Sequence, residues 1–205
     1  MDRMFFTIER FASRVAELAG KRYSFAEHIA PFTAMEGTLG VDEHYHQIPE
    51  KIEGSTFGLN DFFVGRDKYL WLEKTVKVPQ AKEGFDVVGL FDFGKTGGGH
   101  NHGFESLLYV DGQHYQGVDT NHKEVFFSGL EEQDITLTFM LWTGLEGYFG
   151  HREMGADRQY YHQCKKAEFA YLHKKTDELY YFAKAISETL RLIGPSHEYY
   201  SKGSS

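Results

Sequence analysis

The sequence has one cysteine and no long apolar segment, and both shortages narrow what the protein can be. Cys164 alone cannot form an internal disulfide or a cysteine-based zinc site, which fits a reducing compartment. No apolar run approaches the roughly 20 residues that a membrane-spanning helix needs. The N-terminus carries acidic residues where a signal peptide would be apolar. We therefore expect a cytoplasmic protein with no membrane partner.

Basic residues are outnumbered, with 22 Lys and Arg against 30 Asp and Glu, for a formal charge of −8. A general nucleic-acid-binding protein needs a basic face to displace counterions, so we expect no nucleic-acid partner. What the chain does have is aromatic residues, at 16%, together with 22 glycines. That combination is typical of a twisted, turn-rich β core.

The middle of the chain shows the rhythm of short β-strands, with no helical period between Phe57 and Trp142. The pattern predicts a mainly β fold with flanking helices. It would be an antiparallel β-sandwich, of jelly-roll or galactose-binding-like type, followed by a long C-terminal helix or helix pair. The expected strands are residues 69–78, 85–93, two within 103–119, 124–127 and 135–142.

The stretch from Gly103 to Asp119 is the strongest single structural signal. Asp111-Gly112 favours a type I′ turn, in which both central residues have positive φ, so the stretch is expected to form a β-hairpin. Apolar residues alternate on both faces of its first strand, as in a strand that is covered on both sides. The acidic residues Glu105, Asp111 and Asp119 are then better explained as turn and strand-end residues than as a catalytic carboxylate pair.

Helical periodicity appears at both ends. Apolar residues recur from Ile8 to Leu18 at steps of three and four, and Gly20 is a suitable C′ residue. A short capped helix is also expected after Ser24. After Asp157 no Gly or Pro interrupts the chain until Gly194, which leaves one long helix or two joined helices open. The apolar positions there fall close to a heptad seam; they are Leu172, Leu179, Ala183, Ile186, Leu190 and Ile193.

These segments predict a division into four parts. Residues 1–55 form an N-terminal helical and irregular segment that packs on the sandwich, and residues 56–150 form the sandwich. Residues 151–195 form a long helical connector, and residues 196–205 a frayed tail. Because the helical seam is longer than the sandwich can cover, we expect part of it to pack on something else, with a homo-oligomer among the partners.

The most unusual local sequence is the glycine-rich stretch before the hairpin. Glycines permit close approach of a ligand, and His100, Asn101 and His102 could hydrogen-bond sugar hydroxyls or bind a metal. Tyr115 on the hairpin is a further possible sugar or interface contact. The plainer explanation is a solvated loop between strands. A free-standing metal-dependent enzyme using His100 and His102 is a third alternative.

Read together, these segments resemble the N-terminal β-sandwich region of the α-mannosidases of glycoside hydrolase family 38. The resemblance is carried by Tyr69–Pro79, an aromatic strand ending in proline. It is carried more strongly by Glu105–Gly112, which is similar to the family pattern E-x-L-(L/V)-(Y/W)-x-D-G, with Gln116–Asp119 and His122–Val125 after it. The similarity covers about residues 57–142, and the flanking helices only in order and character.

The resemblance implies that this chain is a non-catalytic N-terminal domain, inactive by itself, whose parent hydrolyses α-mannosidic linkages with retention. A zinc-containing catalytic domain would follow the long helix, with mannose-containing oligosaccharides as substrate. In the family a His-x-Asp pair helps to hold that zinc, and this chain has only His-x-His pairs. No catalytic, metal-binding or cofactor-binding residue is therefore carried over. The domain would brace the catalytic domain or an oligomer, and the alternative is an independent carbohydrate-binding module.

Overall fold

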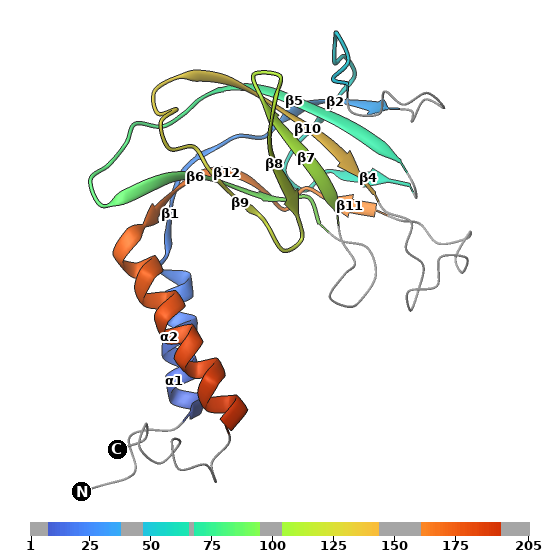
Figure 1. The fold of residues 1–205 in the computed structure, drawn as a ribbon. Helices are drawn as coiled ribbons and strands as arrows, with labels where there is room; N and C mark the ends of the chain where they lie inside the picture. Colours follow the sequence, from blue (N-terminus) through green and yellow to red (C-terminus); the bar gives the residue numbers. More distant parts are fainter. Residues whose placement is uncertain (1–7, 38–46, 66–67, 95–103, 144–160, 194–205) are drawn as a thin grey trace, which may run out of the picture. The chain divides into compact units, whose positions relative to one another are not determined.

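The computed structural model describes residues 8–37, 47–65, 68–94, 104–143 and 161–193, and within them the fold is mainly antiparallel β-sheet (Figure 1). One sheet has four strands in the order β1-β12-β6-β9, and a second has six in the order β3-β2-β5-β10-β7-β8. The strands of the four-stranded sheet are β1 (Tyr23–His28), β6 (Phe85–Asp92), β9 (Glu124–Phe126) and β12 (Lys166–His173). Those of the six-stranded sheet are β2 (Phe32–Gly37), β3 (Ser55–Phe57), β5 (Tyr69–Lys77), β7 (Glu105–Val110), β8 (Gln113–Asp119) and β10 (Asp134–Trp142). The predicted β-sandwich with flanking helices is confirmed.

The β7–β8 hairpin forms as the sequence predicts. Asp111 and Gly112 have φ values of 50° and 78°, which is the left-handed backbone of a type I′ turn. The Asp111 carboxylate accepts a 2.8 Å hydrogen bond from the Thr136 amide, and so ties the turn to β10. The pairing register shifts once, between Leu108 and Tyr109, because Tyr115 is an extra residue in β8.

The core between the sheets is a cluster of phenylalanine rings. Phe139 of β10 contacts Phe91 and Phe93 at centroid distances of 4.8 and 5.2 Å, and Phe32 of β2 at 5.9 Å. All four rings are fully buried. Gly89 of β6 lies against the rings of Phe91 and Phe127, so a side chain there would displace the core. Close packing of these rings explains part of the high phenylalanine content of the sequence.

The six-stranded sheet is covered on its outer face as well. Trp71 of β5 and Tyr109 of β7 are buried there with Ile52, which comes from the segment before β3. Met35, Ile48, Leu107 and Met140 pack around them. This explains why β7 has apolar residues at consecutive positions, since Leu108 points into the sandwich and Tyr109 into the outer cluster.

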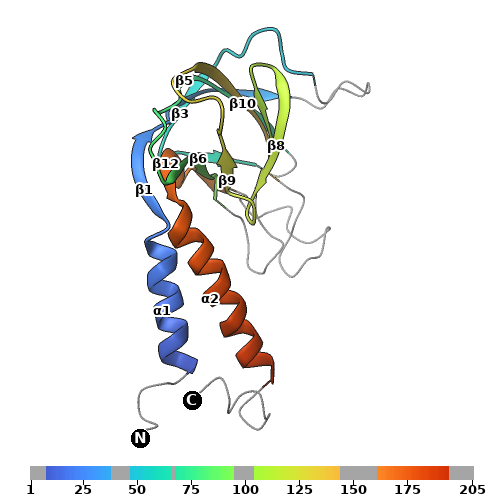
Figure 2. The same cartoon turned by 60° about the vertical axis from the view of Figure 1, so that its left-hand side comes forward.

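The chain divides into two compact units. The sandwich unit consists of residues 25–81 and 87–170, and the helical unit of residues 1–24, 82–86 and 171–205. In the helical unit, α1 (Ile8–Gly20) contacts α2 (Lys174–Ile193), and the two helices lie side by side (Figure 2). The helix predicted from Ile8, with Gly20 at its end, is confirmed.

Arg22 is the polar centre of the helical unit. Its guanidinium lies 2.6 Å from the Asp177 carboxylate and within 4.9 Å of the ring centroids of Tyr23, Tyr180 and Tyr181. Burial acts to lower the pKa of Arg22, but the hydrogen bond to Asp177 and the charge interactions with Tyr23, Asp177 and Tyr181 together outweigh it, and the pKa is raised. A cation that is held by a carboxylate and three aromatic faces fixes the start of α2 to the end of α1.

Three expectations about secondary structure are wrong. The segment from Asp157 is not one continuous helix or helix pair, because residues 166–173 form β12 and α2 begins only at Lys174. Residues 23–28 form β1 rather than a short helix. The segment 1–55, expected to be helical and irregular, also contributes β2, which pairs with β5 inside the six-stranded sheet. In each case pairing with a distant strand overrode a local pattern. The tail 196–205 lies outside the described residues.

No helix among the described residues is long and apolar enough to cross a membrane.

Candidate functional site

A hollow of about 360 Å³ opens beside the edge of the six-stranded sheet, within the sandwich unit. It is bounded by β2, β3, the start of β5, and β4 (Phe62–Val64) with the turn that precedes it. The lining residues are Ala34, Glu36, Ser55, Thr56, Phe57, Asp61, Phe62, Phe63 and Leu70. Two carboxylates, two hydroxyls and exposed aromatic surface therefore meet in one concave place.

Strand pairing positions the floor of the hollow. β3 pairs with β2, which places Ser55 opposite Ala34 and Thr56 opposite Thr33. β2 in turn pairs with β5, which places Glu36 opposite Leu70. In β3 Phe57 is buried, whereas Ser55 and Thr56 are exposed. Because side chains alternate, Thr56 lies on the face opposite Phe57.

A tight turn positions the Asp61 side of the hollow. The Asp61 carboxylate accepts a 2.7 Å hydrogen bond from the Gly58 amide, and Asn60 has the left-handed φ of 70° that such a turn requires. The backbone of Cys164 exchanges two further hydrogen bonds with the turn, at 2.8 Å with Asn60 and 3.0 Å with Asp61. Hydrogen bonds within the turn and to the backbone of Cys164 thus hold it in place without a ligand.

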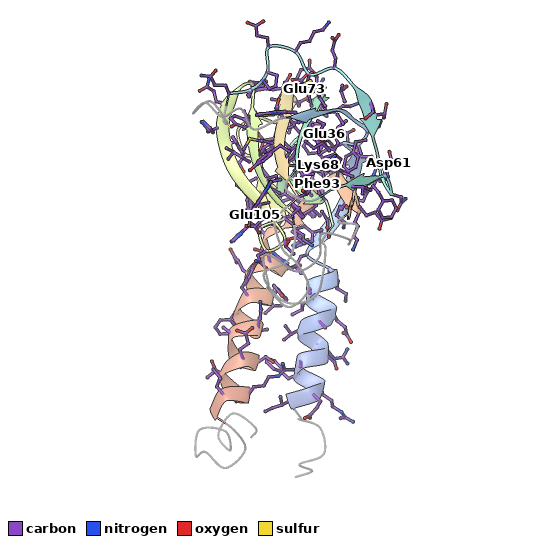
Figure 3. The ribbon with its side chains drawn as sticks, turned by 90° about the vertical axis from the view of Figure 1, so that its right-hand side faces the viewer. Glu36, Asp61, Lys68, Glu73, Phe93 and Glu105 are labelled. Atoms are coloured by element: carbon purple, nitrogen blue, oxygen red, sulfur yellow. The ribbon has the colours of Figure 1, made fainter. Side chains whose placement is uncertain are left out.

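The lining carboxylate of Glu36 forms an ion pair with Lys68. Their charged atoms are 2.9 Å apart, and both side chains are substantially exposed. Figure 3 labels this pair and Asp61. Counting Lys68 with the two lining carboxylates, the local charge is −1, so the hollow disfavours an anionic ligand.

Phe62 supplies the apolar surface of the site. Phe62 is 53% exposed; Phe25 and Phe126 of the same unit are also exposed, but of these three only Phe62 lines the hollow. β4 is held in place by antiparallel pairing with β11 (Tyr161–Gln163), in which Phe62 lies opposite Gln163. An exposed ring beside acceptor oxygens can receive the C–H face of a ligand whose hydroxyls donate to the carboxylates.

The sequence-predicted contacts fall elsewhere. His100, Asn101 and His102 lie outside the described residues. Tyr115 is 41% exposed, but its ring stacks on Phe127 and its hydroxyl donates a 2.6 Å hydrogen bond to the Phe126 carbonyl. Burial of part of the ring raises the pKa of Tyr115. Tyr115 does not line the hollow.

The hairpin carboxylates do not form an acid–base pair. Glu105 lies opposite Asp119 in the β7–β8 register, whereas Asp111 is at the other end of the hairpin. Although burial acts to raise the pKa of Asp119, hydrogen bonds from the His122 ring and the amides of Asn121 and His122 outweigh it and lower that pKa. Asp119 is therefore an ionised carboxylate whose acceptor sites organise the turn after β8.

Cys164 is the least reactive group near the site. Its side chain is fully buried, and burial, with the nearby Asp61 and Asp92 charges, raises the pKa of the thiol to about 12. A thiol in that state is not a nucleophile at neutral pH. Within the described parts of the chain, no group of three or more His, Cys, Asp or Glu residues could hold a metal ion.

Reasoning from sequence missed the hollow because its residues are distant in the chain. Glu36, Ser55 and Asp61 belong to separate short elements, and β4 is fixed by β11, about 100 residues later in the chain. The one local signal was the polar turn Gly58–Asp61 followed directly by two phenylalanines, of which a three-residue strand can bury only one.

Comparison with known proteins adds little to this geometry. No family model matches the sequence, and no curated protein matches it. Among solved structures, the native structure of a family 35 carbohydrate binding module from Clostridium thermocellum aligns with 73% of this chain and 95% of its own. The TM-score is 0.30 and the identity 10%. A likeness of this size does not identify a ligand.

Proposed function

We propose that this chain is a non-catalytic carbohydrate-binding β-sandwich, and that the hollow beside β4 holds a neutral pyranose sugar. The observation that carries the proposal is the exposed ring of Phe62 in one concave site with the carboxylates of Glu36 and Asp61. A pyranose has an apolar C–H face and a rim of hydroxyl donors, which matches one aromatic wall and several acceptors.

The size and charge of the hollow restrict the ligand further. A volume of about 360 Å³ suits one or two sugar rings rather than a long buried chain. The net negative charge disfavours uronic acids, sulfated sugars and sugar phosphates. From the sequence resemblance we propose mannose-containing oligosaccharides as the neutral ligand. An open site of this kind gains about 0.3 kcal/mol per ligand atom, which corresponds to a Kd on the order of millimolar for one hexose.

Isothermal titration with mannose oligomers tests this proposal. We expect mannose oligomers to bind the wild-type protein saturably. Glucuronic acid should not bind, because it carries the disfavoured negative charge. Phe62→Ala should weaken binding by about tenfold or more, because it removes the stacking surface. The matched control is Phe126→Ala, whose ring is 42% exposed on β9 and does not line the hollow. The proposal fails if no neutral sugar binds, or if both variants bind as the wild type does.

A second candidate function is that of an accessory domain in a larger α-mannosidase of glycoside hydrolase family 38. It is favoured by the β7–β8 hairpin, where the residues that carry the sequence resemblance form one paired unit with a type I′ turn. In that role the domain would brace a separate zinc-containing catalytic domain, which would hydrolyse α-mannosidic linkages, and this chain would supply no catalytic residue.

Two observations test the accessory role. Turnover of an aryl α-mannoside by this chain alone would contradict a non-catalytic domain, and we expect none. Coding sequence that continues in frame past Ser205 into a domain with a His-x-Asp motif would support the family assignment; an in-frame stop codon would oppose it. Neither result depends on whether the hollow binds sugar, so the two candidate functions are tested separately.

A further inference from the structure

Lys68 is held next to the hollow at both of its ends. Its backbone amide donates a 2.9 Å hydrogen bond to the Thr143 hydroxyl, and its carbonyl accepts one of 3.0 Å from the Thr143 amide. Thr143 is buried, so this backbone anchor is protected from water. At the other end the Lys68 ammonium group lies 2.9 Å from the carboxylate of Glu36, which lines the hollow (Figure 3).

The stem of the Lys68 side chain also has a prepared position. A Cβ atom at Gly65 would overlap the Cγ, Cδ and Cε atoms of Lys68, so the glycine leaves the space in which the stem lies. Holding a long side chain in one place costs rotamer entropy. The ion pair returns little of that cost, because both of its side chains are substantially exposed. Stability alone therefore does not explain why Lys68 is held in this way.

The ion pair presents a hydrogen-bond donor directly beside an acceptor. Its contact uses one of the three ammonium hydrogens of Lys68 and one of the two carboxylate oxygens of Glu36. The other hydrogens can donate and the other oxygen can accept, from groups that are one hydrogen-bond length apart. Two neighbouring hydroxyls of a pyranose in the gauche arrangement have about the same spacing, and each hydroxyl both donates and accepts.

We propose that Lys68 and Glu36 together bind a vicinal diol of the sugar, an assignment that rests on the carbohydrate site proposed above. One hydroxyl oxygen accepts a hydrogen bond from the Lys68 ammonium group, and the neighbouring hydroxyl donates one to the Glu36 carboxylate. The Asp61 oxygen that does not accept from the Gly58 amide takes a third hydroxyl, and Phe62 takes the apolar face of the ring. The ligand is thus a neutral pyranose with two unsubstituted neighbouring hydroxyls.

In this arrangement Lys68 determines specificity, whereas Phe62 supplies contact area. An aromatic ring stacks on the C–H face of many pyranoses and distinguishes little among them. Hydrogen bonds to charged groups are stronger than neutral ones. A sugar that lacks one hydroxyl of the pair leaves an ammonium or carboxylate group without its partner, which is why such a site rejects the deoxy compound.

Methyl α-mannoside and two of its deoxy derivatives test the diol contact on the wild-type chain. The ring hydroxyls at carbons 2, 3 and 4 of this sugar form two vicinal pairs, and both pairs include the hydroxyl at carbon 3. The 3-deoxy derivative therefore has neither pair, whereas the 6-deoxy derivative keeps both. In nuclear magnetic resonance titrations we expect the 3-deoxy sugar to bind about tenfold more weakly than the parent sugar, and the 6-deoxy sugar to bind within about twofold of it.

Variants of Lys68 test the same contact from the side of the protein. Lys68→Met keeps the stem but removes the donor, so it should weaken binding of methyl α-mannoside about tenfold and leave binding of the 3-deoxy sugar unchanged. Lys68→Arg keeps a donor and should restore most of the affinity. The matched control is Lys166→Met, because Lys166 forms an ion pair with Glu168 on β12 and does not line the hollow.

Failure of the diol contact and failure of the carbohydrate site give different results. If methyl α-mannoside binds and Phe62→Ala weakens it, but the 3-deoxy sugar binds equally well, the diol contact is wrong and the carbohydrate site stands. The same holds if Lys68→Met binds the parent sugar as the wild type does. If none of the three sugars binds the wild-type chain at concentrations on the order of tens of millimolar, both proposals are wrong.

Discussion

Different kinds of contact stabilise the interior of the sandwich unit and the interior of the helical unit. The sandwich interior is a cluster of phenylalanine rings, including Phe32, Phe91, Phe93 and Phe139, with no charge among them. The helical unit instead centres on one cation, Arg22, inside a ring of tyrosines and beside Asp177. An apolar cluster tolerates loss of volume poorly, whereas a partly buried ion pair responds to loss of charge.

The comparison also explains where the two units leave surface open for ligands and partners. In the sandwich unit Phe62 is one of several exposed aromatic residues, and it is the one that lines a hollow with polar walls. The helical unit has only two helices in its described part, and Leu179, Phe182 and Ile186 of α2 remain exposed. The hollow suits a small polar ligand.

The largest effect is expected from Phe139→Ala in the sandwich. The change leaves a cavity among Phe32, Phe91 and Phe93, and should lower the free energy of unfolding by about 3–5 kcal/mol. Urea denaturation measures it. Phe126→Ala, at a half-exposed ring, should lower it by about 1 kcal/mol or less. Similar losses for both variants would show that the phenylalanine cluster is not the core of the sandwich.

A smaller effect is expected from Arg22→Met in the helical unit. The substitution keeps the length of the side chain but leaves Asp177 without its cation, so we expect a loss of about 1–3 kcal/mol. Hydrogen exchange at the amides of α2 reports the loss locally. The control is Arg14→Met, whose ion pair with Glu17 is exposed and should contribute below about 0.5 kcal/mol. An equal response to both changes would contradict the central role of Arg22.

The smallest effect concerns acid stability at the rim of the sandwich. Because the pKa of Asp119 is lowered by folding, its ionised form contributes stability above its unfolded pKa, and this is lost as the pH falls through the folded pKa. The carboxylate is 37% exposed, so the contribution should be below about 1 kcal/mol. Asp119→Asn should be less stable than the wild type at pH 6 and equal to it in strong acid. If the difference in unfolding free energy between the wild type and Asp119→Asn is the same at both pH values, the predicted role of the ionised carboxylate is wrong.

Sequence patterns were most informative where the controlling contacts are local. The turn at Asp111-Gly112, the strand ending before Pro79 and the helix ending at Gly20 all follow from properties of a few adjacent residues. β12 could not be predicted in the same way. Its residues continue directly into α2, and only pairing with β1 and β6 makes them a strand.

The candidate site shows the same limit. Glu36, Asp61 and Phe62 have no common motif, and they come together because β4 pairs with β11 and β2 lies between β3 and β5. The apolar seam predicted along α2 is divided in the structure, because Ala183 and Leu190 are buried whereas Leu179 and Ile186 are exposed. Separating them required knowing which residues α1 covers.

Nuclear magnetic resonance titration with mannotriose tests the central claim most directly, because it locates the bound sugar as well as detecting it. The account predicts that the largest shift changes occur at Ser55, Asp61 and Phe62, and that they disappear in Phe62→Ala. Changes centred instead on the hairpin around Tyr115 and His122, or no changes at millimolar sugar, would contradict a carbohydrate site in the hollow beside β4.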